Sequence, residues 1–233
     1  FILKHIGVNM SREQRLQLRI HDFDDLEKVK EYEKETNHDV KAVEYYLREK
    51  FDEFGLSEYK EYIHFGLTSQ DINTLMNVMG IRDFIQNEYL PNIENIIQIL
   101  FKVADECKNI KMLSRTHGQP ATPTTVRREI YVYLERLIPQ IKKIKDFKFR
   151  TKFGGSVGNL DAHYKSFPEK NWDKIMSNFT KYCLGLDRIE YTTQIHNYIE
   201  LSELFDITKR INTVLIDMCQ DFWQYISIDY FSQ

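Results

Sequence analysis

The sequence predicts an all-α fold in which long helices pack side by side as a bundle. Glycine and proline account for only 9 and 5 of the 233 residues, so the chain has few turns and can form long helices. Apolar residues recur at helical spacing over three long segments, and no segment alternates apolar and polar residues as a strand would. Three amphipathic helices leave apolar surface uncovered, so we expect copies of the chain to complete the bundle.

Helix starts in the first third of the chain carry a hydroxyl residue followed, three residues later, by an amide or acidic residue. This capping spacing satisfies free backbone N–H groups at the start of a helix. It occurs at three places: Ser11–Gln14, Thr36–Asp39 and Thr68–Asp71. Between the first two, the densely charged residues 22–36 predict a solvent-exposed helix.

Three longer segments carry apolar stripes at the spacing of one helix face. The first follows Pro91 and contains Ile93, Ile96, Ile97, Leu100, Ala104 and Cys107. The second contains Val126, Ile130, Leu134, Leu137, Ile141 and Ile144. After a glycine-rich turn at 154–158, a shorter helix carries Trp172, Ile175, Phe179 and Cys183. The last long helix carries Leu204, Ile207, Ile211, Leu215, Met218, Phe222 and Tyr225.

These segments divide the chain into two predicted domains. Residues 1–60 are expected to be the remaining part of an N-terminal helical domain. Residues 61–233 are expected to form a central long-helix bundle domain that is incomplete at its C-terminal end. The chain begins with Phe1 rather than Met and ends directly after a long helix, so we expect it to be a fragment of a longer protein.

Composition excludes several classes of function. The net charge is −3 with both signs mixed, which does not favour a nucleic-acid partner. The chain has three widely spaced cysteines and no C-x-x-C, which fits a reducing, cytoplasmic compartment. No apolar run is long enough to span a bilayer, so no membrane partner is expected.

No metal or cofactor is expected either. His163 and His196 stand apart from other metal-ligand residues, and the chain lacks the spacing of a zinc site. The glycine-rich turn at 154–158 is not a dinucleotide-binding motif, because no strand is predicted before it, and there is no P-loop.

The segment Ser114–Pro123 is the most informative one for chemistry. It forms a polar loop between two apolar-periodic segments and holds one imidazole, three hydroxyls and one amide. Loops held by rigid helices often carry reactive groups. The imidazole of His117 can donate or accept a proton near neutral pH, which makes it a candidate acid or base.

Polar residues also precede other helix starts, at Asn37-His38-Asp39 and at Thr68-Ser69-Gln70-Asp71. The free N–H groups and partial positive charge of a helix N-terminus favour a carboxylate or phosphate ligand. Each segment also has a simpler interpretation, with Thr68 as a capping residue and His38 as an exposed turn residue. A further cluster, Tyr191-Thr192-Thr193-Gln194, is equally consistent with a loop whose hydroxyls bond their own backbone.

Taken together, these motifs resemble the bacterial-type adenylosuccinate lyases, which belong to the fumarase/aspartase superfamily. The resemblance is strongest in Ser114–Pro123, and with Asn37-His38-Asp39 it favours this family over argininosuccinate lyase. It runs in collinear order through Thr36–Tyr45, Ile63–Asn73, Val157–Asn159, Ala162–His163, Tyr191–Ile195 and Arg210–Thr213.

The resemblance implies a C–N lyase without a cofactor that releases fumarate by β-elimination. Its substrates would be adenylosuccinate, which gives AMP, and the succinyl-carboxamide ribotide of purine synthesis. His117 would be the general acid, with Thr116 orienting the substrate. Thr68 and Ser69 would bind a succinyl carboxylate, and Gln194 would also bind substrate. Asn37, His38 and Asp39 would contact the nucleotide portion or orient His117.

The resemblance further implies a homotetramer in which each active site draws on three subunits. The family's mobile loop, which supplies the serine thought to be the catalytic base, has no counterpart in these residues. We therefore expect this polypeptide alone to be inactive. Two alternatives stay open: another fumarate-releasing lyase of the superfamily, and a non-catalytic helical scaffold.

Overall fold

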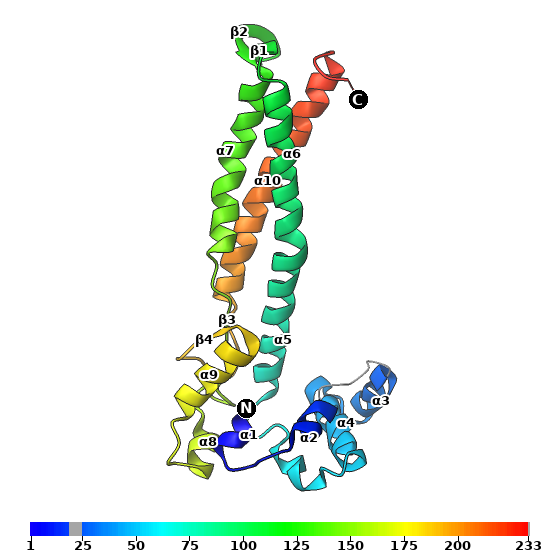
Figure 1. Ribbon diagram of the computed structural model, residues 1–233, viewed down its shortest axis with the longest axis vertical. Helices are drawn as coiled ribbons and strands as arrows, with labels where there is room; N and C mark the ends of the chain where they lie inside the picture. The colour runs from blue at the N-terminus through cyan, green and yellow to red at the C-terminus, as the bar shows by residue number, and fades with distance from the viewer. Residues whose placement is uncertain (19–24, 233) are drawn as a thin grey trace. The chain divides into compact units, whose positions relative to one another are not determined.

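The computed structural model describes residues 1–18 and 25–232, and the chain forms two compact units (Figure 1). The first unit comprises Phe1–Gly80 and Phe149–Asn197, and the second comprises Ile81–Lys148 and Tyr198–Gln233. The predicted all-α class is confirmed, since the described residues are mainly helical and their strands are few and short. The domain boundary near residue 60 stays a prediction.

The first unit is built mostly from short helices. Its helices are α1 (Ile2–His5), α2 (Arg12–Gln17), α3 (Leu26–Thr36), α4 (Asp39–Glu53), η2 (Ser57–Tyr62), most of α5 (Ser69–Phe84), α8 (Asp161–Ser166) and α9 (Trp172–Leu184). Two short strands, β3 (Arg150–Thr151) and β4 (Asp187–Arg188), pair in parallel. This pairing lays the segment before the glycine-rich turn beside the segment that follows α9.

The helix starts of the first unit test the capping predictions. The Ser11–Gln14 capping box is confirmed, because each side chain accepts a hydrogen bond from the other residue's backbone N–H. The predicted Thr36–Asp39 pair is wrong, and His38 caps α4 instead. Thr36 is the last residue of α3, where its hydroxyl donates to a carbonyl one turn earlier. Residues 22–24 of the predicted charged helix lie outside the described residues, and most of the remainder forms α3.

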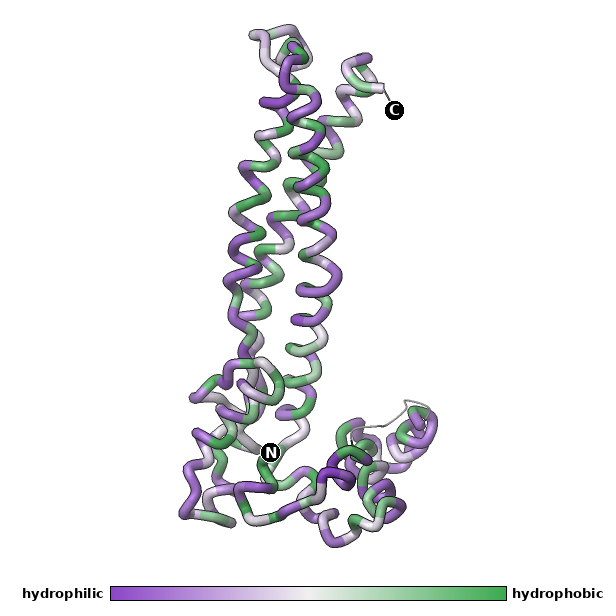
Figure 2. Tube along the Cα trace, viewed as in Figure 1, coloured by the Kyte–Doolittle hydropathy of each residue, from purple (hydrophilic) through white to green (hydrophobic). Residues whose placement is uncertain are grey.

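The second unit contains three helices that pack side by side (Figure 1). A single π-helical turn, η3 (Ile85–Tyr89), leads into α6 (Leu90–Glu106), and α7 (Val126–Lys145) and α10 (Ile199–Ser227) complete the set. Helix α7 packs against both α6 and α10. Hydrophobic and hydrophilic residues are interspersed along each helix (Figure 2).

The predicted stripes of these three helices are confirmed. All six predicted residues of α7 are buried, from Val126 to Ile144. In α6 and α10 every predicted residue is buried or half-buried. Polar bonds between the helices add to this core, since Tyr133 of α7 donates to Asp221 of α10, and Tyr225 of α10 donates to Glu129 of α7. Burial raises the pKa of the Tyr133 phenol, which keeps its proton available for that bond.

The expectation of no strand is wrong, because the predicted polar loop is a β-hairpin. Strands β1 (Lys111–Thr116) and β2 (Gln119–Thr125) pair antiparallel around a two-residue turn, His117-Gly118. Both turn residues have positive φ, 52° and 74°, as a type I′ hairpin turn requires. The side chains of both strands are exposed or half-buried. Because neither strand has a buried face, its sequence lacks the alternation of apolar and polar residues by which strands are recognised.

The α7 core yields a stability prediction. Leu137 is 0% exposed, so Leu137→Ala leaves a cavity and is expected to lower the free energy of unfolding by about 2–5 kcal/mol. Glu135→Ala, at an exposed position of the same helix, is the control and is expected to change it by less than about 0.5 kcal/mol. Urea unfolding of both variants measures the difference. Equal losses would show that this stripe does not form the core.

Candidate active site

The starts of α4 and α5 are joined by side-chain bonds in the first unit. The His38 ring accepts the Lys41 backbone N–H at Nδ1, with a distance of 3.3 Å. The other ring nitrogen, Nε2, lies 3.0 Å from Ser69 Oγ. In the neutral ring the proton therefore sits on Nε2 and is donated to Ser69, which leaves the serine hydroxyl hydrogen free to donate to a ligand.

A second, longer bond links the same two helices. Asn73 of α5 donates to Asp39 Oδ2 across 3.5 Å, while Asp39 Oδ1 accepts the Val40 backbone N–H at 2.7 Å. Asn37 lies beside these groups in the chain, exposed, in the left-handed conformation that ends α3. The structure thus brings together two of the polar segments that the sequence singled out, and it gives His38 a capping role and a contact with Ser69.

The start of α5 is fixed by Asp71. The Thr68 backbone N–H donates to Asp71 Oδ2 at 2.9 Å, which is half of the predicted capping pair. Asp71 also accepts the backbone N–H groups of Gly154 and Gly155, at 2.9 and 3.0 Å. Its Oδ1 lies 2.6 Å from Lys152 Nζ. The capping pattern predicts only a local role for Asp71, and Lys152 was not predicted, because no local pattern links positions 81 residues apart.

The glycine-rich turn also contacts the segment that leads to Gln194. A Cβ added at Gly158, whose φ is +81°, would lie 2.2 Å from the Thr192 carbonyl oxygen. Only glycine permits this approach. Gln194 itself is exposed, and the neighbouring Thr193 hydroxyl donates to the Ile195 carbonyl at 3.1 Å, as the simpler loop interpretation expects. Gln194 therefore lies on a segment fixed at Thr192.

The buried side chain of His163 packs against the segment that leads to Thr68. Its ring is fully buried, with the Phe65 and Trp172 rings at centroid distances of 5.1 and 5.0 Å. A Cβ at Gly66 would meet the His163 ring at 2.5 Å, so the backbone of the segment leading to Thr68 lies directly on the imidazole. Burial lowers the pKa of His163, against the opposing effects of the Phe65 backbone and the Asp71 carboxylate.

Thr116 and His117 lie in the second unit, on the hairpin, and both are exposed. The hairpin is held by Tyr230, whose hydroxyl donates to the Leu113 carbonyl at 3.0 Å and whose ring lies under the Arg115 guanidinium. A polar groove of about 570 Å³ runs along the hairpin and the start of α7; its lining includes Lys111, Ser114, Thr122, Thr124, Arg128 and Glu129. The imidazole of His117 is therefore presented to solvent on a braced turn.

Two further properties of the described residues bear on the site. Within residues 1–18 and 25–232, no group of three or more histidine, cysteine, aspartate or glutamate side chains could hold a metal ion. Among the helices that the structure describes, none is long and apolar enough to cross a membrane.

Comparison with known sequences relates this chain to lyases. The family described as lyase matches residues 13–232. The adenylosuccinate lyase of Dictyostelium discoideum is 47% identical over 90% of this chain and 46% of that protein. Adenylosuccinate lyases of Legionella pneumophila (strain Corby) and Escherichia coli (strain K12) are 44% and 39% identical, over 89% and 90% of this chain. The chain spans about half the length of the curated relatives it matches.

Comparison with solved structures supports the fold. The crystal structure of fumarate lyase from Mesorhizobium sp. BNC1 aligns with a TM-score of 0.78 over 96% of this chain and 51% of that chain. The two sequences are 18% identical, so the likeness concerns the fold.

The burial of His163 predicts a loss of stability in acid. In the unfolded chain its imidazole binds a proton below about pH 6.5, whereas the folded chain binds it only at lower pH. The free energy of unfolding is therefore expected to fall as the pH drops below about 6.5, by up to about 1.4 kcal/mol per pH unit. Urea unfolding at a series of pH values measures this slope.

The variant His163→Phe keeps a buried ring without the titrating nitrogen and is expected to flatten the slope between pH 7 and 5. The exposed His5 provides the control, because His5→Phe removes an imidazole but leaves His163 in place and should retain the wild-type slope. An unchanged slope in His163→Phe would assign the acid sensitivity to other groups.

Proposed function

Because this chain belongs to the lyase family, we propose that it is part of an adenylosuccinate lyase. The reaction is β-elimination of fumarate from adenylosuccinate to give AMP, and from the succinyl-carboxamide ribotide of purine synthesis. The observation that carries the proposal is the similarity to curated adenylosuccinate lyases over about nine-tenths of this chain. No cofactor is required for this chemistry, and the cytoplasm is the compartment we propose.

The proposed roles are those that the resemblance to the adenylosuccinate lyases implies. β-Elimination needs a group that protonates the departing nitrogen and donors that stabilise the negative charge developing on the carboxylate. His117 is the proposed general acid, with Thr116 orienting the substrate. Thr68 and Ser69, at the start of α5, are proposed to bind a succinyl carboxylate, since the helix start offers N–H groups and the Ser69 hydroxyl hydrogen is free to donate.

The remaining site residues are proposed to bind the rest of the substrate. His38 contacts Ser69, and Asn37 and Asp39 are its neighbours in the sequence. These three residues would contact the nucleotide portion of the substrate. Gln194, exposed beside the fixed Thr192, would also bind substrate. The catalytic base is proposed to lie outside these 233 residues.

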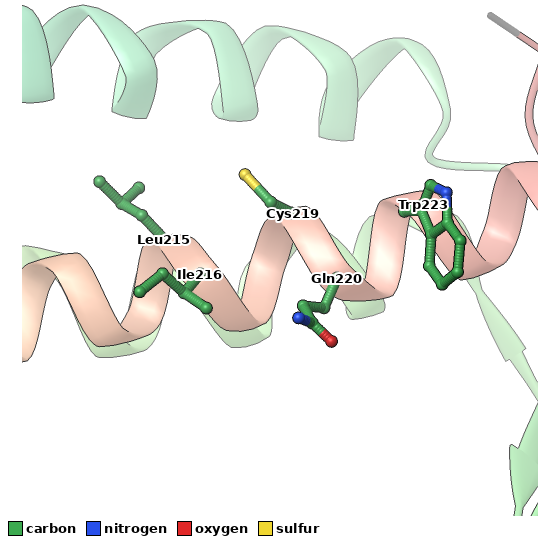
Figure 3. A pocket seen from close by; sticks show the side chains of 5 residues that line it. All are labelled: Leu215, Ile216, Cys219, Gln220 and Trp223. Atoms are coloured by element: carbon green, nitrogen blue, oxygen red, sulfur yellow. The ribbon is translucent and has the colours of Figure 1, made fainter.

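We also propose that four copies assemble and share their active sites. In the second unit, α10 exposes an apolar groove of about 390 Å³ lined by Leu215, Ile216, Cys219, Gln220 and Trp223 (Figure 3). Ile216 and Trp223 are 60% and 69% exposed. Neighbouring exposed apolar side chains on one helix face favour association with another apolar surface. Another copy of the same amphipathic helices is the partner that would extend the bundle.

The acid assignment is tested in the whole protein, with any sequence that flanks these residues included. His117→Ala is expected to lower the turnover of adenylosuccinate by about two to four orders of magnitude, because the departing nitrogen loses its proton donor. Fumarate release, followed by absorbance, measures the turnover. His5→Ala, which removes an exposed histidine of the first unit, is the control, and the 233-residue chain alone is expected to be inactive.

Near-normal turnover in His117→Ala would move the acid elsewhere, and His38→Ala would be measured next. No fumarate release from the whole wild-type protein would favour one of the two alternatives. A panel of other succinyl substrates then separates a different fumarate-releasing lyase from a non-catalytic scaffold.

The proposed assembly is tested by sedimentation. The whole wild-type protein is expected to sediment as a tetramer, and Ile216→Asp is expected to dissociate it by placing a charge in the apolar groove. Ser166→Asp adds the same charge at an exposed position of α8 and is the control. A wild-type monomer at all concentrations would contradict the assembly.

A further inference from the structure

The Asp71 carboxylate is a junction between two segments that lie far apart in the sequence. It accepts one backbone N–H from the start of α5, at Thr68, and two from the glycine-rich turn, at Gly154 and Gly155. These bonds measure 2.9 to 3.0 Å. Asp71 is 0% exposed, so water cannot replace any of the three donors. The start of α5 is thereby fixed to the turn through a single side chain.

Lys152 completes the junction and changes its charge. Its ammonium lies 2.6 Å from Asp71 Oδ1 and donates to the Gly155 carbonyl at 2.7 Å, and its side chain is also 0% exposed. An isolated buried carboxylate would repel an anion bound nearby, and this repulsion is strong where little water screens it. The Lys152 cation cancels that charge. The start of α5 is therefore held by a carboxylate whose negative charge is paired with a cation.

The glycine-rich turn also lies close to the backbone of two other segments, at Gly66 and at Thr192. A Cβ at Gly155, whose φ is +79°, would lie 2.9 Å from the Gly66 carbonyl oxygen, on the segment that leads to Thr68. At its other end, Gly158 approaches the Thr192 backbone. Such contacts leave little freedom for the backbone on either side. The glycine-rich turn, which the proposed chemistry does not use, is therefore the connector of the site in the first unit.

We propose that Asp71 and Lys152 are positioning residues for the carboxylate-binding site at Thr68 and Ser69. The inference rests on the proposed function, since it assumes that these two residues bind a carboxylate of the succinyl group. Neither Asp71 nor Lys152 touches the ligand. Asp71 fixes the backbone and hydroxyl donors at the start of α5, and Lys152 neutralises the carboxylate that does so.

The two products of the proposed reaction separate this role from a general contribution to stability. In the proposed site, fumarate would occupy the part that binds the succinyl carboxylates. AMP would occupy the part that binds the nucleotide. Loss of the junction should weaken the binding of fumarate and spare that of AMP. A general loosening of the fold would weaken both.

The test uses the double variant Asp71→Asn/Lys152→Met in the whole protein. Replacing both ions together avoids a buried, uncompensated charge, which would be strongly destabilising. The amide of the asparagine still accepts hydrogen bonds on one side but presents N–H donors to the backbone N–H groups on the other. The inhibition constant of fumarate, measured against adenylosuccinate cleavage, is expected to rise at least tenfold. That of AMP is expected to stay within twofold of the wild-type value.

An exposed ion pair of the same unit supplies the matched control. Asp161 and Lys165 are 2.9 Å apart on α8, with side chains that are mostly exposed. Asp161→Asn/Lys165→Met carries the same two substitutions and is expected to leave both inhibition constants unchanged. An unchanged fumarate constant in the Asp71/Lys152 variant, or equal weakening of fumarate and AMP, would overturn the positioning role. A wild-type protein that neither cleaves adenylosuccinate nor binds either product would overturn the proposed function itself.

Hydrogen exchange in the wild-type protein provides a measurement that needs no variant to fold. Fumarate bound at Thr68 and Ser69 is expected to slow exchange of the Gly154 and Gly155 amides, because both amides donate to Asp71. AMP is expected to leave them unchanged. Protection confined to the start of α5, with no change at the two glycines, would contradict the coupling.

Discussion

The buried ion pair of Asp71 and Lys152 is the interaction on which the first unit depends. Removing two ions from water costs several kcal/mol for each ion, and a salt bridge alone often fails to offset this cost. Here three backbone N–H groups and one carbonyl share the task with the ionic contact. The pair is therefore better understood as a specific connection between the start of α5 and the glycine-rich turn than as a simple source of stability.

Much of the second unit could be predicted from the sequence because its structure is set by local periodicity. The stripe from Val126 to Ile144 needs only the 3.6-residue repeat of a helix to be recognised, and every member is buried. The hairpin at His117-Gly118 could not be recognised in this way. Its strands have no buried face. Its two turn residues adopt the left-handed conformation, but one of them is a histidine, a residue that rarely does so.

The sequence predicted which residues belong to the candidate site better than it predicted the contacts that join them. Polar residues before helix starts indicated Asn37–Asp39 and Thr68–Ser69 separately, and resemblance to a family supplied their proposed roles. The bond between His38 and Ser69 joins residues 31 positions apart, and no local rule predicts it. The Thr36–Asp39 prediction failed for a related reason, because the structure caps α4 with His38, which the sequence analysis did not predict as a cap. Local patterns identify the candidates, whereas tertiary contacts decide between them.

The proposed assembly would explain two features of the chain that the isolated fold does not. An apolar groove on α10 costs free energy while it faces water, and the imidazole of His117 can protonate a substrate only where that substrate is held beside it. Among the described residues the groove is open to solvent and the His117 side chain is exposed. If further subunits supply both, then the exposure of Ile216 and that of His117 have the same cause. The association that buries the bundle's apolar surface would also complete the site, so folding energy and catalytic geometry would be coupled through the same helices.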